Sequence, residues 1–171
     1  MSQTRTQLRD HIEANPGVHF NELVRTLDLA PGQVQYHVRR LLRSDAVVSE
    51  SIYGRTHYFS PAFDEWERGV LALFRRETAR DVLGYLLEHG SARPAEVADA
   101  VGIARSTLEW HLDHLTEQDV VRKRRDGNRV VLELERPEAT RQLLADVSPS
   151  LPGRFVDRFT RLVDSLLEEA D

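Results

Sequence analysis

The sequence predicts a mainly helical α+β protein made of two copies of one small unit, each ending in a β-hairpin. Three observations support this prediction. Residues 8–60 align without a gap with residues 82–134, at a constant offset of 74 residues. Apolar residues in each copy recur at the spacing of an amphipathic helix. Two strand-forming runs around a glycine then close each copy.

The aligned positions of the two copies hold residues of the same kind, over too long a register for a short solenoid repeat. Apolar residues align with apolar residues, and several polar residues are identical. Examples are the pairs Val34/Leu108, Tyr36/Trp110, His37/His111, Asp45/Asp119 and Arg55/Arg129. We therefore expect a duplicated domain. The predicted boundaries are 1–60 for the first copy, 61–77 for a linking helix, 78–136 for the second copy and 137–171 for C-terminal helices.

Turn-forming residues divide the first copy into its elements. Asn15, Pro16 and Gly17 end a first helix. Pro31 is a favoured first helical residue and follows a turn at 28–30. Gly54 separates two β-prone runs. The predicted elements are helices at 5–14, 21–27 and 31–44 and strands at 46–52 and 56–60.

The second copy repeats this order. Asp126-Gly127 is one of the strongest hairpin signals, so we expect a turn at 126–128. The predicted elements are helices at 79–89, 94–101 and 105–118 and strands at 120–125 and 130–135. The linking segment 61–77 is expected to be helical, either separate from or continuous with the helix that follows it.

Residues after the second copy are expected to form two more helices. The first covers 137–147, and Pro149 and Pro152 end it. The second covers 154–170 and is amphipathic. Its apolar stripe packs either on its own domain or on the same helix of a second chain, and the linking helix, with Phe63, Trp66 and Phe74, is a rival dimer surface. We expect a homodimer, with candidate dimerisation residues Phe155, Phe159, Leu162 and Leu166.

Three helices followed by a β-hairpin form a winged helix-turn-helix, and the third helix carries a specific resemblance. Residues 30–41 resemble the recognition-helix motif of ArsR-type winged-helix regulators, with Val34, His37, Val38 and Leu41 in its spaced core. Residues 104–115 carry the same motif, and the two glycine hairpins resemble the wings of that family. The resemblance covers about two thirds of the chain. It implies a DNA-binding fold, while the family's cysteine metal-sensing motif is absent.

The composition narrows the function further. The chain has 171 residues, 23 basic and 28 acidic side chains and a net charge of −5. This acidic balance argues against a non-specific, histone-like DNA coat. The absence of cysteine excludes disulfides, thiol catalysis and cysteine-based zinc sites. No apolar run is long enough for a membrane helix and no signal peptide is recognisable, so we expect a cytoplasmic protein with no membrane partner.

Arginine supplies every basic residue except Lys123. A GC-rich genome explains this preference, and a salt-rich cytoplasm is an equally weighted alternative. Two such units in one acidic, arginine-rich chain resemble regulators of salt-loving archaea.

The third helix of the first copy is the best candidate for base recognition. At 100° per residue, Val34, Val38, Leu41 and Leu42 face inward. Arginine and glutamine on the opposite face can form bidentate hydrogen bonds with guanine and adenine. The alternative is a solvated charged face. The candidate DNA-binding residues in this copy are Gln33, Gln35, Tyr36, His37, Arg39, Arg40, Arg43 and, in the wing, Arg55.

The second copy has a different outward face. Asp113 and Glu117 occupy the positions of Arg39 and Arg43, so insertion into a groove is less favourable. Its wing is the more basic one, which suggests contacts with the DNA backbone, while exposed Trp110 suggests an assembly surface. The candidate DNA-binding residues are Arg105, Ser106, Thr107, Arg122, Lys123, Arg124, Arg125 and Arg129.

No residue pattern indicates catalysis or a cofactor. His37 and His111 are expected either to bridge helix and loop or to donate to phosphate or bases. His111 and His114 lie on adjacent helical turns but lack a clear third ligand, so we assign no metal. No phosphate-binding glycine loop or nucleophile elbow is present, and no enzyme is predicted.

Two functional hypotheses follow. The first is a sequence-specific double-stranded DNA-binding transcription regulator, acting on promoter operators as a homodimer and blocking or recruiting the transcription machinery. The alternative is a tandem winged-helix module for protein–protein interactions within a transcription or chromosome-associated assembly. The net charge and the acidic second recognition helix favour the alternative, whereas the basic first recognition helix and second wing favour DNA.

Overall fold

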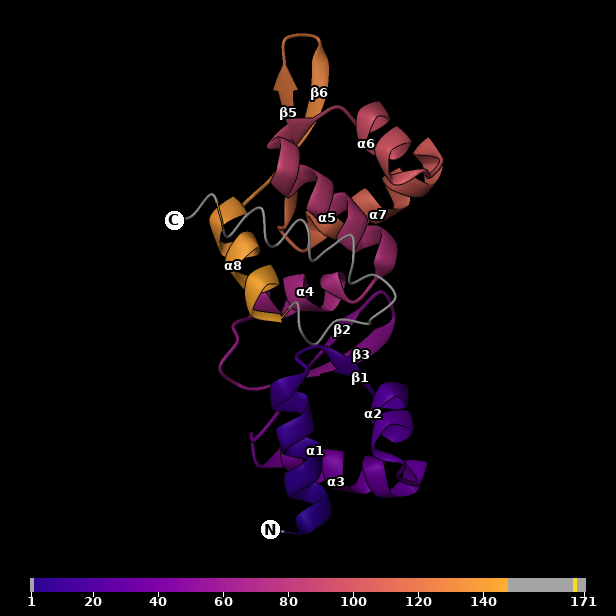
Figure 1. The fold of residues 1–171 in the computed structure, drawn as a ribbon, viewed down its shortest axis with the longest axis vertical. Helices are drawn as coiled ribbons and strands as arrows, with labels where there is room; N and C mark the ends of the chain where they lie inside the picture. The colour runs from indigo at the N-terminus through magenta and orange to yellow at the C-terminus, as the bar shows by residue number, and fades with distance from the viewer. Residues whose placement is uncertain (1, 148–167, 169–171) are drawn as a thin grey trace. The chain divides into compact units, whose positions relative to one another are not determined.

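The computed structural model describes residues 2–147 and 168 (Figure 1). The chain divides into two compact units, Met1–Ala72 (unit 1) and Leu73–Asp171 (unit 2). Each unit contains three consecutive helices and a three-stranded antiparallel sheet, which is the winged helix-turn-helix arrangement. This confirms the predicted fold class, mainly helical α+β with small β-hairpin wings.

Local signals in the sequence explain where the elements of unit 1 begin and end. Asp28 adopts a left-handed conformation (φ 50°) and ends the second helix, and Pro31 begins the third. Tyr53 and Gly54 both have positive φ, as the tight type I′ hairpin turn requires. The elements are α1 (Gln3–Ala14), β1 (Val18–His19), α2 (Phe20–Leu27), α3 (Pro31–Arg43), β2 (Val48–Ile52) and β3 (Arg55–Phe59).

The short strand β1 completes the sheet of unit 1, whose order is β1-β3-β2. Val18 pairs with Tyr58 of β3. Next to this pair, the buried His57 has its Nδ1 atom 2.7 Å from the carbonyl oxygen of Gly17. The contact ties the start of β1 to the wing, which fixes the wing relative to α2.

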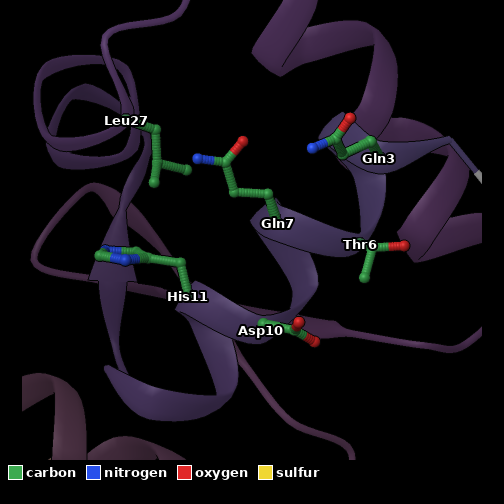
Figure 2. Close-up of a pocket in the computed structure, with 6 residues that line it drawn as sticks. All are labelled: Gln3, Thr6, Gln7, Asp10, His11 and Leu27. Atoms are coloured by element: carbon green, nitrogen blue, oxygen red, sulfur yellow. The ribbon is translucent and has the colours of Figure 1, made fainter.

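An open groove of about 520 Å³ runs along α1 in unit 1 (Figure 2). Leu27 of α2 lies across from Gln7 and His11 in this groove. Its remaining lining residues are Gln3, Thr6 and Asp10. The groove contains none of the predicted DNA-binding residues.

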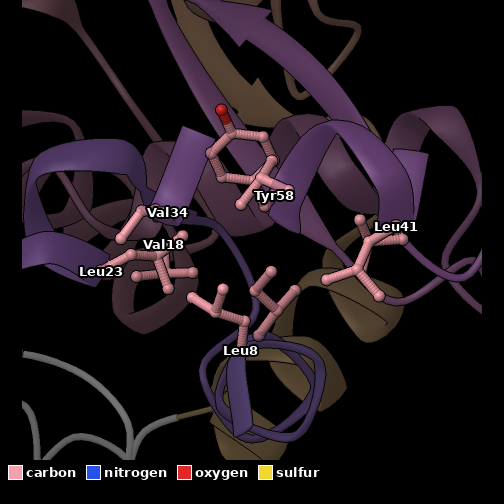
Figure 3. Close-up of a cluster of buried hydrophobic side chains, with 9 residues drawn as sticks. Leu8, Val18, Leu23, Val34, Leu41 and Tyr58 are labelled. Atoms are coloured by element: carbon pink, nitrogen blue, oxygen red, sulfur yellow. The ribbon is translucent and has the colours of Figure 1, made fainter. Parts of the chain in front are cut away.

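One face of α3 is anchored in the core of unit 1 (Figure 3). Val34, Val38 and Leu41 are buried, as the helical spacing predicts, and Leu42 is partly buried. They join a cluster from α1, β1, α2 and the wing that includes Leu8, Ile12, Val18, Leu23, Val47 and Tyr58. Because burying side chains of this size contributes about 1.5–3 kcal/mol each, the orientation of α3 is fixed and its opposite face is held toward solvent.

Unit 2 repeats this plan with its own local signals. Gly102 ends its second helix in a left-handed conformation, at the position equivalent to Asp28. Its sheet order is β4-β6-β5. The elements are α5 (Glu77–His89), β4 (Ser91–Ala92), α6 (Pro94–Val101), α7 (Arg105–Glu117), β5 (Val121–Asp126), β6 (Arg129–Leu134) and α8 (Pro137–Val147).

The linking segment contains α4 (Glu65–Phe74), which crosses the boundary between the units. Asp64 and Glu67 cap its first turn, since each side chain accepts a hydrogen bond from the backbone N–H of the other. Arg68 ties α4 to unit 1 through an ion pair with Glu50 on β2, with an Nη2–Oε1 distance of 2.7 Å.

The structure corrects several expectations. β1 and β4 were not predicted, because two-residue strands leave no alternating pattern. α4 is not continuous with α5, since it ends at Phe74 and α5 begins at Glu77. Phe74 is fully buried and offers no surface to a second chain. In the second wing Asp126 pairs with Arg129, so Gly127 and Asn128 form the turn. The candidate dimerisation residues Phe155, Phe159, Leu162 and Leu166 lie outside the described residues.

Candidate nucleic-acid interface

The exposed face of α3 carries polar and cationic side chains and no carboxylate. Tyr36 is 55% exposed, which is unusual for a large aromatic residue and places its ring at the surface. The other exposed members of this face are Gln33, Gln35, Arg39, Arg40 and Arg43. The structure thus brings six of the seven predicted α3 residues to one solvent-facing surface, which we call the basic face.

The arginines of the basic face have no acidic partner among the described residues. Arg40 donates from Nη1 to the Tyr36 hydroxyl at 3.1 Å, and its guanidinium lies 5.7 Å from the centre of that ring. Arg39 and Arg43 form no ion pair within the part of the chain that is described. Their positive charge is therefore available to an external anion.

The two glutamines of α3 differ in whether their side chain caps the helix. The Gln33 Oε1 atom accepts a hydrogen bond from the Ala30 backbone N–H at 3.3 Å, so this side chain caps its own helix. Gln35 is exposed. Gln33 must exchange its capping bond to contact a base, whereas Gln35 is not engaged in that cap.

His37, the seventh predicted residue of α3, lies at the edge of the basic face and is partly buried. Its ring packs edge-on against Tyr36, with centroids 5.0 Å apart. Burial, with the nearby charges of Arg5 and Arg40, holds the pKa of His37 below its ordinary value of 6.5. The ring is therefore neutral near pH 7 and adds no charge to the face.

In the first wing, Arg55 is the first residue of β3 and is exposed. It borders a pocket of about 240 Å³ together with His19, Phe20 and Asn21 at the start of α2 and with two residues of β3, Thr56 and Tyr58. This places a cationic side chain next to the beginning of the second helix of the same unit.

The corresponding face of α7 in unit 2 is acidic. Asp113 and Glu117 are exposed at the positions that Arg39 and Arg43 occupy in α3. Trp110 is 53% exposed and takes the place of Tyr36. We call Trp110, Asp113 and Glu117 the acidic face. Only the first turn of α7 offers the expected polar contacts, since Arg105, Ser106 and Thr107 are all exposed there.

In unit 2, most of the basic residues that are predicted to bind DNA form ion pairs with carboxylates of the same unit. The Glu133 side chain on β6 accepts from Arg122 Nε at 2.6 Å and from Arg124 Nε at 3.1 Å. Glu109 on α7 binds Lys123 Nζ at 2.9 Å and lies 3.6 Å from Arg105 Nη2. These two carboxylates are therefore shared among four of the predicted DNA-binding cations and offset part of their positive charge.

The ion pairs at Glu133 also change its acidity. Burial raises the pKa of Glu133, but the hydrogen bonds and positive charges of Arg122 and Arg124 outweigh burial, so the net pKa is lower than usual. Glu133 thus stays ionised throughout the physiological range. Among the described residues, Arg125 and Arg129 are the second-wing cations without an ion pair.

Glu109 and Glu133 are not among the site residues predicted from the sequence. Glu133 lies directly across the hairpin from Arg122, and this register follows once the turn is placed at Gly127 and Asn128. Glu109 and Arg105 are separated by four residues on one helix, a spacing that favours ion pairs. The link from Glu109 to Lys123 joins a helix to a strand, so only the tertiary structure reveals it.

The histidines of α7 form an aromatic cluster. The Trp110 ring lies 4.9 Å from His111 and 4.7 Å from His114, both at steep angles. His114 is partly buried, although it was expected to face outward. Burial, with His114 and Arg76 nearby, lowers the pKa of His111. In the described residues, no group of three or more His, Cys, Asp or Glu side chains is arranged to hold a metal ion.

Comparisons with known proteins agree with this architecture. Residues 2–71 match a family described as an N-terminal HTH domain, and residues 75–122 match one described as winged helix-turn-helix DNA-binding. The chain is also similar to an uncharacterized HTH-type transcriptional regulator of Methanocaldococcus jannaschii, with 26% identity over 131 residues. This match covers 77% of the chain and 33% of the relative, so the chain spans about a third of that protein's length.

The two family matches together indicate two helix-turn-helix domains, the second of a DNA-binding winged type. In the described part of the chain, every helix is too short or too polar to cross a bilayer.

Proposed function

We propose that the chain is a sequence-specific double-stranded DNA-binding transcription regulator that acts on promoter operators as a homodimer. The observation that carries this proposal is the basic face of α3, where Gln35, Tyr36 and three arginines are exposed without a carboxylate beside them. A recognition helix in the major groove needs such donors, because arginine pairs with guanine and glutamine with adenine.

The two units divide the work in this proposal. Unit 1 reads bases through α3 and places Arg55 of its wing against the backbone. Unit 2 contacts phosphates through its second wing, where Arg125 and Arg129 extend from the hairpin. Arg105, Ser106 and Thr107 add backbone contacts at the start of α7. This division follows from charge, since Asp113 and Glu117 would repel phosphates at the equivalent of the base-reading positions.

A homodimer fits this function because regulators of this kind commonly bind two half-sites one helical turn apart. The apolar stripe with Phe155, Phe159, Leu162 and Leu166 is our candidate for the dimer contact. The ArsR-type resemblance and a salt-loving archaeal source belong to the same proposal, and the archaeal relative supports the archaeal part of it alone.

Genome-wide DNA pull-down with tagged protein, cross-linked in its host, tests the proposal. We expect discrete peaks at promoters that share a roughly palindromic motif. Absence of enrichment while the protein is expressed would contradict it. That result would favour the alternative of a protein–protein interaction module, for which exposed Trp110 beside two carboxylates is the supporting observation.

A further inference from the structure

The acidic face of α7 is a surface that the proposed function does not use. Trp110 is 53% exposed, and Asp113 and Glu117 lie on the same side of the helix. Among the described residues, neither carboxylate forms an ion pair. This distinguishes them from Glu109 and Glu133, which are both bound to cations of their own unit.

The basic face of α3 has the complementary character at equivalent positions. Arg39 and Arg43 correspond to Asp113 and Glu117 through the 74-residue offset, and Tyr36 corresponds to Trp110. Each charged pair is four residues apart on a regular helix, a rise of about 6 Å. The two faces therefore carry opposite charges with the same spacing.

We propose that the acidic face of α7 binds the basic face of α3 on a second copy of this chain. Two ion pairs form at once when the helices lie alongside each other, because the spacing is the same on both. Trp110 contributes a ring on which an arginine can stack. Within one chain, Arg40 already lies over the Tyr36 ring, so arginine and aromatic side chains at these positions are long enough for such a contact.

A second copy is the occupant that the charges favour. DNA is repelled by the carboxylates. The basic face of α3 has the required cations at the required spacing, and it has no acidic partner among the described residues of its own unit. Ion pairs between exposed side chains are individually weak and screened by salt. The contact is therefore expected to be weak and to dissociate as the salt concentration rises.

This docking has a regulatory consequence, which rests on the proposed function. A copy whose α3 is covered by α7 of another copy cannot place α3 in a groove. Weak docking competes with weak, non-specific DNA binding, whereas an operator with full base contacts displaces it. The acidic face would thus suppress binding to random sequence more than binding to the operator.

Charge reversal tests the docking without DNA. Sedimentation of the full chain would compare the wild type with Asp113→Arg/Glu117→Arg and with Arg39→Glu/Arg43→Glu at about 0.1 M and about 1 M salt. We expect the salt-sensitive part of the self-association to be about tenfold weaker in each variant than in the wild type at low salt, because attraction becomes repulsion. A homodimer held by the apolar stripe is not screened by salt and is unchanged in both variants. Mixing the two variants should restore association, since each basic face then meets an acidic one.

The matched control is Glu13→Arg/Asp99→Arg, which reverses two exposed carboxylates outside both faces. This control should self-associate like the wild type. Thermal melting of every variant shows whether the fold is kept. The proposal is overturned if the reversed variants associate as the wild type does, or if their mixture gains nothing over each alone.

The two proposals can fail separately. If mixing the two variants restores association but promoter DNA is not enriched in cells, the docking proposal holds and the proposal of a transcription regulator is contradicted. If the protein binds an operator but mixing the variants does not restore association, the regulator proposal holds and the docking proposal is contradicted. The docking proposal is also overturned if the wild type and the charge-reversed variants differ in self-association as much at about 1 M salt as at about 0.1 M, because contacts between exposed charges are screened at the higher concentration.

Discussion

The helices α3 and α7 occupy the same place in their units, follow equivalent left-handed turns at Asp28 and Gly102, and present equivalent faces to solvent. Their chemistry differs. The face of α3 holds arginines without carboxylates, and the face of α7 holds carboxylates, while nearby cations are bound by Glu109 and Glu133. One fold can therefore be duplicated while its surface charge changes, because the buried positions that orient the helix stay apolar and the exposed positions are free to differ.

The largest expected effect separates the two helices directly. We predict that Arg39→Ala/Arg40→Ala weakens operator binding about thirtyfold or more, since each lost base contact costs roughly 1–3 kcal/mol. Asp113→Ala/Glu117→Ala should not weaken it, because those carboxylates offer nothing to DNA. Gel-shift titration with an operator duplex measures both. Equal losses of operator affinity in the two variants would contradict the assignment of base recognition to unit 1 alone.

A second prediction concerns the bound cations of unit 2. Glu133→Gln should release Arg124 from its ion pair, leave Arg122 with only the longer contact to Glu135 at 3.9 Å, and increase affinity for random-sequence duplex. The slope of log affinity against log salt should steepen by about 0.9 for each new phosphate contact. Glu138→Gln is the matched control, because Glu138 pairs with Arg141 within α8, outside the second wing. An unchanged slope would show that Glu133 does not restrain these arginines.

The smallest expected effect is on stability against pH. The pKa values of His37 and His111 are lowered in the folded state, so the unfolded state binds more protons below about pH 6.5. Stability should therefore decrease as the pH falls through this range. His37→Gln and His111→Gln should each flatten this dependence, because each removes a ring that binds a proton more readily in the unfolded state.

Denaturant melts between pH 5 and pH 8 measure this dependence. Each variant is referred to its own stability at pH 8, which removes the cost of the substitution itself. A pH profile identical to that of the wild type in both variants would mean that other groups cause the dependence.

The sequence predicted most of the fold and the membership of the basic face. Helical spacing placed Val34, Val38 and Leu41 inside and Arg39, Arg40 and Arg43 outside, because one buried stripe determines the opposite exposed one. It did not predict β1 and β4, which exist only through pairing with distant strands. The sequence also did not predict that Glu133 and Glu109 form ion pairs with cations of the second wing.

The ion pairs of the second wing could not be predicted from the sequence, for a physical reason. A run such as Arg122-Lys123-Arg124-Arg125 appears strongly basic when it is counted along the chain. In three dimensions a facing strand and a neighbouring helix supply Glu133 and Glu109, and three of these four cations are paired. Net charge at a site depends on tertiary neighbours, which a local pattern does not contain.

The measurement that tests the central claim most directly is the specificity ratio, the Kd for scrambled duplex divided by the Kd for operator. It should be determined for the wild type, Arg39→Ala/Arg40→Ala and Arg125→Ala/Arg129→Ala. Loss of base contacts lowers specificity, whereas loss of phosphate contacts weakens all sequences alike. We predict that the ratio collapses in the α3 variant and is unchanged in the wing variant, which loses affinity for both duplexes. A ratio that collapses in the wing variant and persists in the α3 variant would contradict the assignment of base recognition to unit 1.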